Sequence, residues 1–480
     1  MTRVKRTPDD PPEPVHSRTS VATDVDSPYG LRPFTASPPC VLLSRIRAMS
    51  TFTPLCSAKI SRMASCSSLA AFVAIGACAG SSTQATSSAE ERDFEPAVEE
   101  LWAVGGIAGE GWEIFSDRIQ VAFDAEGRVR IFDALGGRVH LLERDGTYIR
   151  SWGEKGEGPG ELSIPMDLVV HRDGSTSILD FGKRGFVQFD ASGEYVGELA
   201  MDLGRGMPTG GLLSHPDGSV IAAGNGMFMR MGARQSNDTE MTLPIRRFAL
   251  DGTGVSVIHE AWSPPRPGSE TGRGFSGGDH MMAFETVTII GFQPELHVGV
   301  FPDGRLLVAD STTWTLDVLS PDGTVVAEYS RPHFPIPVTE EMQARERSRR
   351  IKELEDGGAG AGVVVMTALH GGGPSIQASG PSEAQLAQIE SMLFATELPV
   401  IDELAVDWEG RIWVERRTED LSGTGPIDLL SADGNYLATI PRTGIRIPVA
   451  FGPDGLAAYI EFDEYDVPTV RIVRLGQMPG

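Results

Sequence analysis

Cysteine is almost absent from this chain of 480 residues, and its few copies are confined to one end. Cys40, Cys56, Cys66 and Cys78 are the four cysteines, and residues 79–480 contain none. A disulfide framework is therefore excluded for the main body of the protein. A cysteine nucleophile and a thiolate-bound zinc ion are excluded there for the same reason.

Positive charge is also scarce. The chain has 41 Lys and Arg residues against 66 Asp and Glu residues, which gives a formal net charge of −25. Such a surface repels the phosphate backbone of nucleic acids, so we expect no nucleic-acid partner. A surface charge that only keeps the protein soluble is the alternative interpretation.

Long hydrophobic runs are missing as well. The run "SLAAFVAIGA" (residues 68–77) is only ten residues long, whereas a membrane-spanning helix needs about 20. Lys59 and Arg62 precede this run, and small residues follow it, as is typical of a secretory signal peptide. Met49 is then the better start, so residues 1–48 are expected to be disordered or an upstream extension that is not part of the protein.

The end of the signal-like segment carries a lipidation motif. Its last residues, "IGAC" (75–78), resemble a bacterial lipobox. The resemblance implies that residues 49–77 are removed as a lipoprotein signal peptide and that Cys78 carries the lipid. An ordinary secretory signal beside an incidental cysteine is the alternative. Residues 78–97 read as a flexible tether, and the resemblance predicts an anchored protein of the bacterial cell envelope that faces the periplasm or the exterior.

Turns that end in glycine recur along the rest of the chain at regular intervals. Asp-Gly between apolar runs predicts a hairpin, because glycine accepts the positive φ of such turns. In three places one turn follows another after 19 residues: Glu126 and Asp145, Asp173 and Ser192, and Asp303 and Asp322. A longer interval of 44 to 47 residues also recurs, and alternating apolar residues lie between the turns. Four short strands in a period of this length are typical of a propeller blade.

Counting the turns predicts an all-β fold, a six-bladed β-propeller of four-stranded antiparallel blades over residues 98–480. Residues 98–104 ("VEELWAV") have no blade of their own and are expected to close the ring as the outermost strand of the sixth blade. The pattern resembles the NHL-repeat and TolB-like six-bladed propellers. The matching segments are "GEGPGEL" followed by Pro165, "DGSTSILDFGKRGFVQFDASGEYV" (173–196) and "DGRLLVADSTTWTLDVLSPDGTVV" (303–326).

Two long insertions interrupt the repeat between blades. One spans about residues 262–296, and the other spans about 331–399 and contains two helix-like segments, so a helical insertion is predicted between blades 4 and 5. Both are blade-to-blade connections and should emerge on one face of the propeller, where they could cover the mouth of the central channel.

The candidate ligand face lies beside these insertions. Four second strands end in aspartate: Asp133, Asp180, Asp310 and Asp463. A ring of carboxylates could bind a hard cation such as Ca²⁺. The alternative is that each aspartate caps its own turn. Lys183, Arg184 and Trp314 are candidate ligand contacts in the same loops, and His297 is expected to be a half-buried residue of an inner strand.

A propeller fold does not specify an activity. The favoured prediction is a binding scaffold at the cell envelope for a small ligand or a protein partner, held at the membrane by its anchor, without a cofactor. The alternative is a metal-assisted hydrolase or lyase, similar to lactonases, acting at the channel mouth. Gluconolactonase-type sites use Glu, Asp and Asn ligands, yet this chain has only three asparagines, Asn225, Asn237 and Asn435.

Overall fold

The computed structural model divides into two compact units, residues 1–77 and 78–480. All residues that the structure describes belong to the second unit. They are residues 84–86, 91–107, 109, 111–201, 208, 211–222, 243–252, 254–262, 289–355, 383–421, 423–442 and 444–480. The predicted extension (1–48), the predicted signal peptide (49–77) and Cys78 lie outside them.

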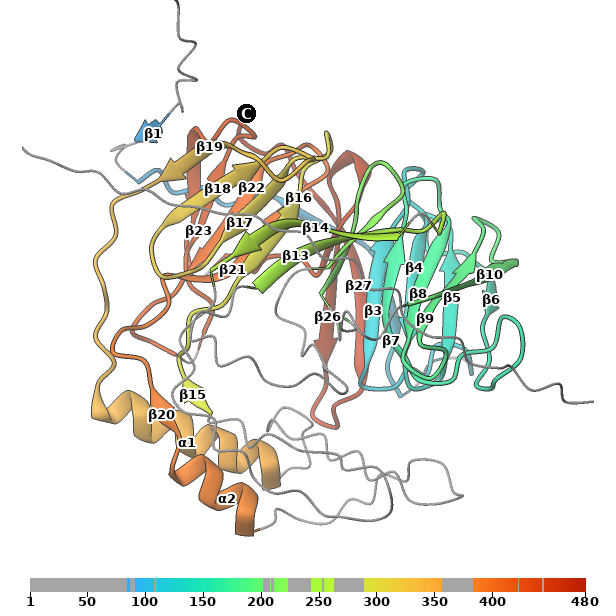
Figure 1. Ribbon diagram of the computed structural model, residues 1–480, viewed down its shortest axis with the longest axis horizontal. Coiled ribbons are helices and arrows are strands. Elements are labelled where there is room, and N and C mark those ends of the chain that lie inside the picture. The colour runs from blue at the N-terminus through green and yellow to red at the C-terminus, as the bar shows by residue number, and fades with distance from the viewer. Residues whose placement is uncertain are drawn as a thin grey trace, which may run out of the picture. The chain divides into compact units, whose positions relative to one another are not determined.

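Within the described chain, six sheets each contain four antiparallel strands, and one of the six has a fifth, parallel strand; we name them blades 1 to 6 (Figure 1). Blade 1 contains β3 (Ile119–Phe123), β4 (Val129–Asp133), β5 (Arg138–Leu142) and β6 (Tyr148–Trp152). Blade 2 contains β7 (Pro165–Val170), β8 (Thr176–Asp180), β9 (Gly185–Phe189) and β10 (Tyr195–Ala200). Blade 3 contains β11 (Leu212–Ser214), β12 (Val220–Ala222), β13 (Leu243–Ala249) and β14 (Gly254–Ala261).

The second half of the propeller repeats this order. Blade 4 contains β16 (His297–Val300), β17 (Leu306–Ala309), β18 (Thr315–Leu319) and β19 (Val325–Ser330), and β1 (Gln84–Thr86) adds to it in parallel. Blade 5 contains β21 (Ile401–Val406), β22 (Ile412–Arg416), β23 (Ile427–Leu430) and β24 (Tyr436–Ile440). Blade 6 contains β25 (Ala450–Phe451), β26 (Leu456–Phe462), β27 (Pro468–Leu475) and β2 (Val98–Gly105), with a short 3-10 helix at Pro453–Gly455. The predicted six-bladed fold is confirmed.

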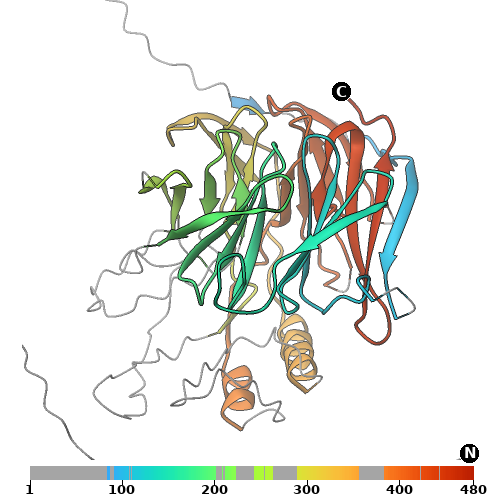
Figure 2. The ribbon, with the colours of Figure 1, turned by 90° about the vertical axis from the view of Figure 1, so that its right-hand side faces the viewer.

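Strand β2 joins the last blade to the beginning of the propeller. It pairs antiparallel with β27, from Val98 opposite Leu475 to Gly105 opposite Thr469, and is the outermost strand of blade 6. In Figure 2 it is the blue strand beside the red strands of the C-terminal end. This is the pairing that the sequence predicted for residues 98–104.

The hydrophobic core consists of six clusters, one at each interface between neighbouring blades. Strand alternation explains how one strand serves two interfaces. In β4, Val129 and Ile131 point into the cluster shared with blade 6, and Phe132 points into the cluster shared with blade 2. These side chains are fully buried, so apolar packing between sheet faces is the main force that holds the blades in a ring.

The insertions on either side of blade 4 meet each other. The first contributes β15 (Ile290–Gly291) and the second contributes β20 (Leu393–Phe394), and the two strands pair in parallel. The second insertion also forms α1 (Glu340–Glu355) and α2 (Glu383–Glu390), which confirms the helical insertion predicted between blades 4 and 5. Both views show the helices outside the ring of strands (Figures 1 and 2). No helix in the described part of the chain is long and apolar enough to cross a membrane.

Antiparallel blades give the propeller two distinct faces. The turn face carries the loops between first and second strands and between third and fourth strands. Its described residues are 124–128, 143–147, 171–175, 190–194, 215–219, 250–252, 301–305, 320–324, 407–411, 431–435 and 452–455. The connection face carries the loops between second and third strands and the blade-to-blade connections. Its described residues are 106–107, 109, 111–118, 134–137, 153–164, 181–184, 201, 208, 211, 262, 289–296, 310–314, 331–400 except 356–382, 417–426 except 422, 441–449 except 443, and 463–467.

Candidate functional site

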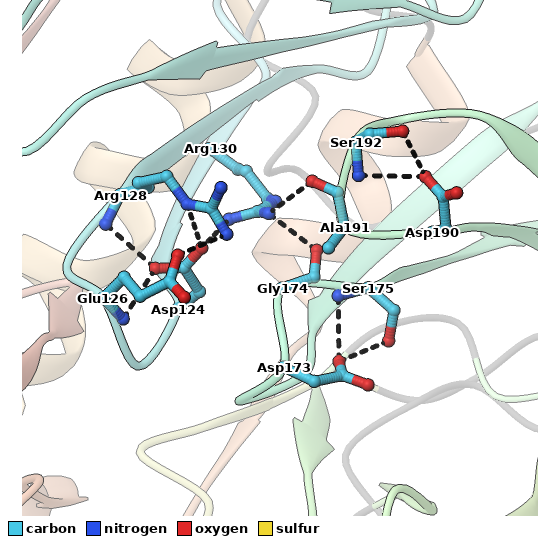
Figure 3. Close-up of polar contacts among 10 residues, drawn as sticks. All are labelled: Asp124, Glu126, Arg128, Arg130, Asp173, Gly174, Ser175, Asp190, Ala191 and Ser192. Carbon is cyan, nitrogen blue, oxygen red and sulfur yellow. Dashed lines mark hydrogen bonds and ion pairs between the residues drawn. The ribbon is translucent and has the colours of Figure 1, made fainter.

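Buried charge on the turn face joins blade 1 to blade 2 (Figure 3). Asp124 is 1% exposed and accepts hydrogen bonds from the backbone N–H groups of Glu126 and Arg128. Its carboxylate also pairs with Arg130, 2.9 Å away, whose side chain is fully buried. The Arg130 guanidinium then donates to the carbonyl oxygen of Gly174 in blade 2, at 2.6 Å. A buried ion pair with these additional hydrogen bonds fixes the relative position of the two blades.

Other turn-face contacts continue around the ring. The His215 ring lies 2.9 Å from the carbonyl oxygen of Gly304, which joins blades 3 and 4. Between opposite blades 2 and 5, the guanidinium of Arg172 lies over the Trp408 ring, 4.4 Å from its centroid. The Trp408 indole N–H in turn donates to the carbonyl oxygen of Phe451 in blade 6, at 2.6 Å. Residues of the turn face thus contact one another between neighbouring blades and, through Arg172 and Trp408, across the axis of the ring.

Several turn-face carboxylates are stabilised in their charged form, although burial raises the pKa of Glu409. A hydrogen bond from Ser175 is the main cause that lowers the pKa of Asp173, and Ser192 lowers the pKa of Asp190 in the same way. At Asp217, burial opposes ionisation, yet hydrogen bonds from Ser219 and His215 outweigh it and lower the pKa to about 2. Hydrogen bonds to the charged form therefore dominate at these turns.

On the connection face, two of the four predicted aspartates bind the loops that flank their own blades. Asp133 accepts a hydrogen bond from the Gly136 N–H at 2.8 Å and from the Ser116 hydroxyl at 2.5 Å. Asp180 accepts from the N–H groups of Ser163 at 2.7 Å and Lys183 at 3.0 Å. Both aspartates thereby order the blade-to-blade connection together with the second-to-third strand loop.

Among the described residues, the other two aspartates have hydrogen bonds only within their own turns. Asp310 accepts hydrogen bonds from the N–H and hydroxyl groups of Thr312, and Asp463 accepts from the N–H groups of Tyr465 and Val467. In the described ranges, no three His, Cys, Asp or Glu side chains are grouped as metal ligands. Each of the four aspartates thus caps its own turn.

The other predicted contacts have different surroundings. The Lys183 amine donates to the carbonyl oxygens of Glu157 and Gly158 and lies 3.2 Å from the Glu198 carboxylate. Arg184 occupies a left-handed turn position with φ of 57°. Trp314 is 2% exposed and belongs to the cluster between blades 4 and 5, so its ring packs in the core.

A group of ionisable side chains that the sequence did not single out lies where the innermost strands of blades 4 and 5 begin. Asp402 of β21 forms an ion pair with Arg417. Next to it, Glu403 lies opposite Glu415 in the register of β21 and β22. Burial lowers the pKa of His297, which opens β16, and the neighbouring Asp402 opposes this effect. His297 is partly buried, as expected from the sequence.

Glu403 is the most perturbed member of this group. Desolvation by the surrounding protein raises its pKa to about 7, the carboxylates of Glu415 and Asp402 add to the effect, and Arg446 opposes it. The side chain nevertheless reaches solvent. A carboxyl group with a pKa near neutrality can accept or donate a proton at physiological pH. The sequence signal was the consecutive acidic pair on an inner strand, where apolar residues are otherwise common.

Exposed apolar side chains distinguish the two faces. In the described chain, the loops of the connection face expose Ile107, Ile114, Leu135, Trp262, Phe334, Val449 and Tyr465, by 40% to 86%. Leu393 of β20 and Phe462 at the end of β26 are exposed on the same side. The described turn-face residues include none of the exposed large hydrophobic residues, and the others lie on outermost strands.

The two insertions form a joint structure on the connection face. Besides the pairing of β15 with β20, the ring of Phe292 lies 5.8 Å from that of Phe394. Arg347 of α1 stacks over Phe394, 4.6 Å from the ring centroid. A buried Glu346 binds Arg349 and Arg350 within α1. Connections from both sides of blade 4 are therefore held together by specific contacts.

Comparison with known proteins identifies the fold. The DUF5128 family model, described as a 6-bladed beta-propeller, matches residues 116–207. A protein of Bacteroides fragilis NCTC 9343 that is described as exported is similar in structure. The two chains are 11% identical over 81% of this chain and 98% of that chain, with a TM-score of 0.42. A gluconolactonase of Xanthomonas campestris has 12% identity over 80% of this chain and 91% of its own, and a TM-score of 0.35.

A further similar structure is the calcium-binding protein regucalcin of Agrobacterium tumefaciens, with 14% identity over 81% of this chain and 98% of that chain, and a TM-score of 0.33. No curated protein matches the chain. The family match covers blades 1 and 2 and agrees with the strand order of the structure. The chain is a six-bladed β-propeller.

Proposed function

We propose that this protein is an exported, lipid-anchored propeller that binds a partner or ligand through its connection face. Within the propellers, we place it near the NHL-repeat and TolB-like proteins. The observation that supports binding is the unequal distribution of exposed apolar side chains in the loops, all of which lie on the connection face in the described chain. Exposed apolar groups that share one face favour an interaction surface, since burying them against a partner removes them from water.

The joint insertion structure supports the same face. Long loops with secondary structure of their own are commonly functional, and here two of them are tied together by β15 and β20. The turn face differs, because its polar groups already bind one another around the ring. A partner would gain little there from burying polar groups that are already satisfied.

Photo-crosslinking in bacterial cells tests this proposal. A photoreactive residue would replace Phe334 or Tyr465 on the connection face, and Thr147 or Asp433 on the turn face as controls. All four side chains are exposed. We expect discrete crosslinked species from the first pair of positions and none from the second. Equal crosslinking from both faces, or crosslinking from the turn face alone, would contradict a connection-face site.

Labelling with radioactive palmitate tests the anchor independently. The full chain should incorporate label, the Cys78→Ser variant should lose it, and the Cys66→Ser variant should retain it. Retention of label in Cys78→Ser, or its absence from the full chain, would refute lipidation at this cysteine.

A second candidate function, a hydrolase or lyase acting at the mouth of the ring, is favoured by one observation. Glu403 has a pKa of about 7 and reaches solvent, as a general acid or base requires. The described residues do not fit a metal site of three His, Cys, Asp or Glu ligands, so no metal-dependent step is derived.

Thermal unfolding tests whether this candidate enzyme is metal-assisted. The protein would be unfolded with EDTA and then with Ca²⁺, Mn²⁺ or Zn²⁺ added back. A metal at a hundred times its dissociation constant stabilises a protein by about 2.7 kcal/mol. A rise specific to one metal would favour the metal-assisted form of the enzyme. An unchanged midpoint with every ion would count against that form and leave only an acid-base role for Glu403 to test.

A further inference from the structure

The segment that follows Cys78 is attached to the rim of the propeller. Strand β1 (Gln84–Thr86) pairs in parallel with β19, the outermost strand of blade 4. Asp93 then forms a parallel bridge with Thr439 of β24, the outermost strand of blade 5. Strand β2 continues on the outer edge of blade 6. Parts of one segment thus add in turn to the outer edges of three consecutive blades, and we name its described residues (84–86 and 91–105) the rim strap.

Specific bonds hold the middle of the rim strap on blade 5. The Phe94 N–H donates to the carbonyl oxygen of Thr439 at 2.9 Å, and the Thr439 N–H donates to the carbonyl oxygen of Arg92 at 2.8 Å. The Arg92 N–H donates to the Tyr436 hydroxyl at 2.9 Å. The Phe94 side chain packs on the cluster between blades 5 and 6.

A buried carboxylate on the neighbouring strand β23 supports these contacts. Asp428 is 1% exposed, accepts a hydrogen bond from the Thr439 hydroxyl at 2.8 Å, and pairs with Arg416 at 3.2 Å. Arg416 also binds Glu91 of the rim strap, at 2.7 Å. Residues 91–94 fall within the range that the sequence predicted as a flexible tether (78–97), yet backbone and side-chain bonds attach them to blade 5.

This attachment limits how far an anchored propeller can lie from its lipid. Six residue steps separate Cys78 from Gln84 in the sequence, and a fully extended chain of that length spans only about 20 Å. We propose that the outer strands of blades 4 and 5 form the surface that lies against the membrane, so that the protein is mounted by its rim. The inference rests on the proposed lipid anchor at Cys78.

Mounting by the rim has a consequence for binding. Because β1 runs parallel to β19, its N-terminal end lies toward the turn face, so in a rim-mounted protein the connection face points away from the anchor. The apolar side chains of the connection face then remain accessible to a partner. A long tether would fix no orientation, whereas a short one restricts the rotation of the whole propeller.

Hydrogen exchange of the full chain tests the rim strap without reference to lipid. We expect protected amides at Phe94 and Thr439 and, in Tyr436→Phe, about fivefold faster exchange at residues 92–94, because one hydrogen bond of ordinary strength is lost. Tyr459→Phe is the matched control, since it removes a buried tyrosine hydrogen bond in blade 6. Unprotected Phe94 in the parent chain, or the same acceleration in both variants, would overturn the strap.

Fluorescence quenching tests the mounting in the lipidated protein. Val326→Cys on β19 and Ile149→Cys on β6 place a dye at equivalent positions on opposite blades 4 and 1, and both side chains are exposed. With quencher-labelled lipids in the bilayer, we expect at least twofold stronger quenching at position 326 than at position 149. Equal quenching, or stronger quenching at 149, would refute rim mounting. Failure of palmitate labelling would instead refute the anchor and leave the exchange result unaffected.

Discussion

The two faces of this propeller use the same residue types for opposite purposes. On the turn face, carboxylates such as Asp173 and Asp190 have lowered pKa values, since serine hydroxyl and backbone groups donate to them. Where the inner strands begin at the connection face, burial raises the pKa values of Glu403 and Glu415. Carboxylates of the first group stabilise the fold in their charged form, and those of the second group are charged at a cost.

The apolar residues are divided in the same way. Large exposed hydrophobic side chains of the described loops lie on the connection face, while the turn face binds itself together from blade to blade. This difference indicates that two sets of contacts stabilise the ring: apolar packing between blades and polar contacts between the turns of the turn face. The connection face can therefore expose apolar side chains and hold carboxyl groups with raised pKa values, which cost stability, without loss of the fold.

The largest effect is expected from breaking the buried charge of the turn face. Asp124→Ala would leave the fully buried Arg130 without its carboxylate, which typically lowers the free energy of unfolding by about 3–5 kcal/mol. Urea denaturation would measure the loss. Asp145→Asn changes an exposed turn aspartate of the same blade and should have a far smaller effect.

A double variant separates the charge from the turn. Asp124→Ala combined with Arg130→Met removes both partners, so no charge remains buried without a partner. It should recover part of the stability lost in Asp124→Ala alone. A double variant that is no more stable than the single one would show that the unpaired charge of Arg130 is not what destabilises Asp124→Ala, and that the lost turn hydrogen bonds of Asp124 account for the effect.

The pH dependence of stability should differ between the faces. Because the folded-state pKa of Glu403 is raised from 4.5 to about 7, its contribution to stability is fully present below pH 4.5 and is lost as the pH rises through 7. Glu403→Gln should therefore flatten the decline of the urea midpoint between pH 5 and 8. Glu415, Asp402 and Arg446 surround this carboxyl and remain in the variant.

Asp217 on the turn face provides the opposite case. Its pKa is lowered from 3.8 to about 2, so its contribution is present above pH 3.8 and is lost as the pH falls through 2. Asp217→Asn should lower the midpoint at pH 7 and converge with the parent protein at low pH. If the urea midpoints of Glu403→Gln and Asp217→Asn depended on pH in the same way, the proposed electrostatic difference between the two faces would be wrong.

Periodicity made the fold predictable from the sequence. The turn pairs 19 residues apart and the alternation between them depend only on strand length and turn chemistry, so they predict blades without knowledge of long-range contacts. Asp133 and Asp180 end the second strands β4 and β8, and Asp310 and Asp463 directly follow β17 and β26. Their partners, such as Ser116 for Asp133 and Ser163 for Asp180, lie in preceding blade-to-blade connections.

The site was less predictable because it depends on contacts between blades. Glu403 is perturbed by Glu415 on a neighbouring strand and by Arg446 in the connection to blade 6. Trp314 looked like a loop residue in the sequence, but packing against blade 5 buries it. The composition of residues 78–97 suggested a flexible segment. Composition alone cannot show that residues 91–94 bind the outermost strand of blade 5.

A smaller effect is expected from the contact that spans the ring axis on the turn face. Arg172→Gln removes the cation from the Trp408 ring, which typically lowers the free energy of unfolding by about 0.5–1 kcal/mol at a site that solvent reaches. Arg305→Gln provides the comparison within one blade, because Arg305 stacks over Phe301 and pairs with Asp303 of the same turn. If Arg172→Gln alone accelerates hydrogen exchange in the turns of both blade 2 and blade 5, the contact couples opposite blades. If each variant accelerates exchange only in its own turn, the contact is ordinary local packing.

The smallest effect on stability is expected on the connection face, where function should respond instead. Phe334 is 86% exposed, so Phe334→Ser should change the free energy of unfolding by no more than about 0.5 kcal/mol. The same substitution should reduce crosslinking from a photoreactive residue at position 465. Val325→Ser on the rim, where the parent side chain is 50% exposed, should change neither quantity. A clear loss of stability in Phe334→Ser would show that this side chain supports the fold, and undiminished crosslinking would remove it from the binding surface.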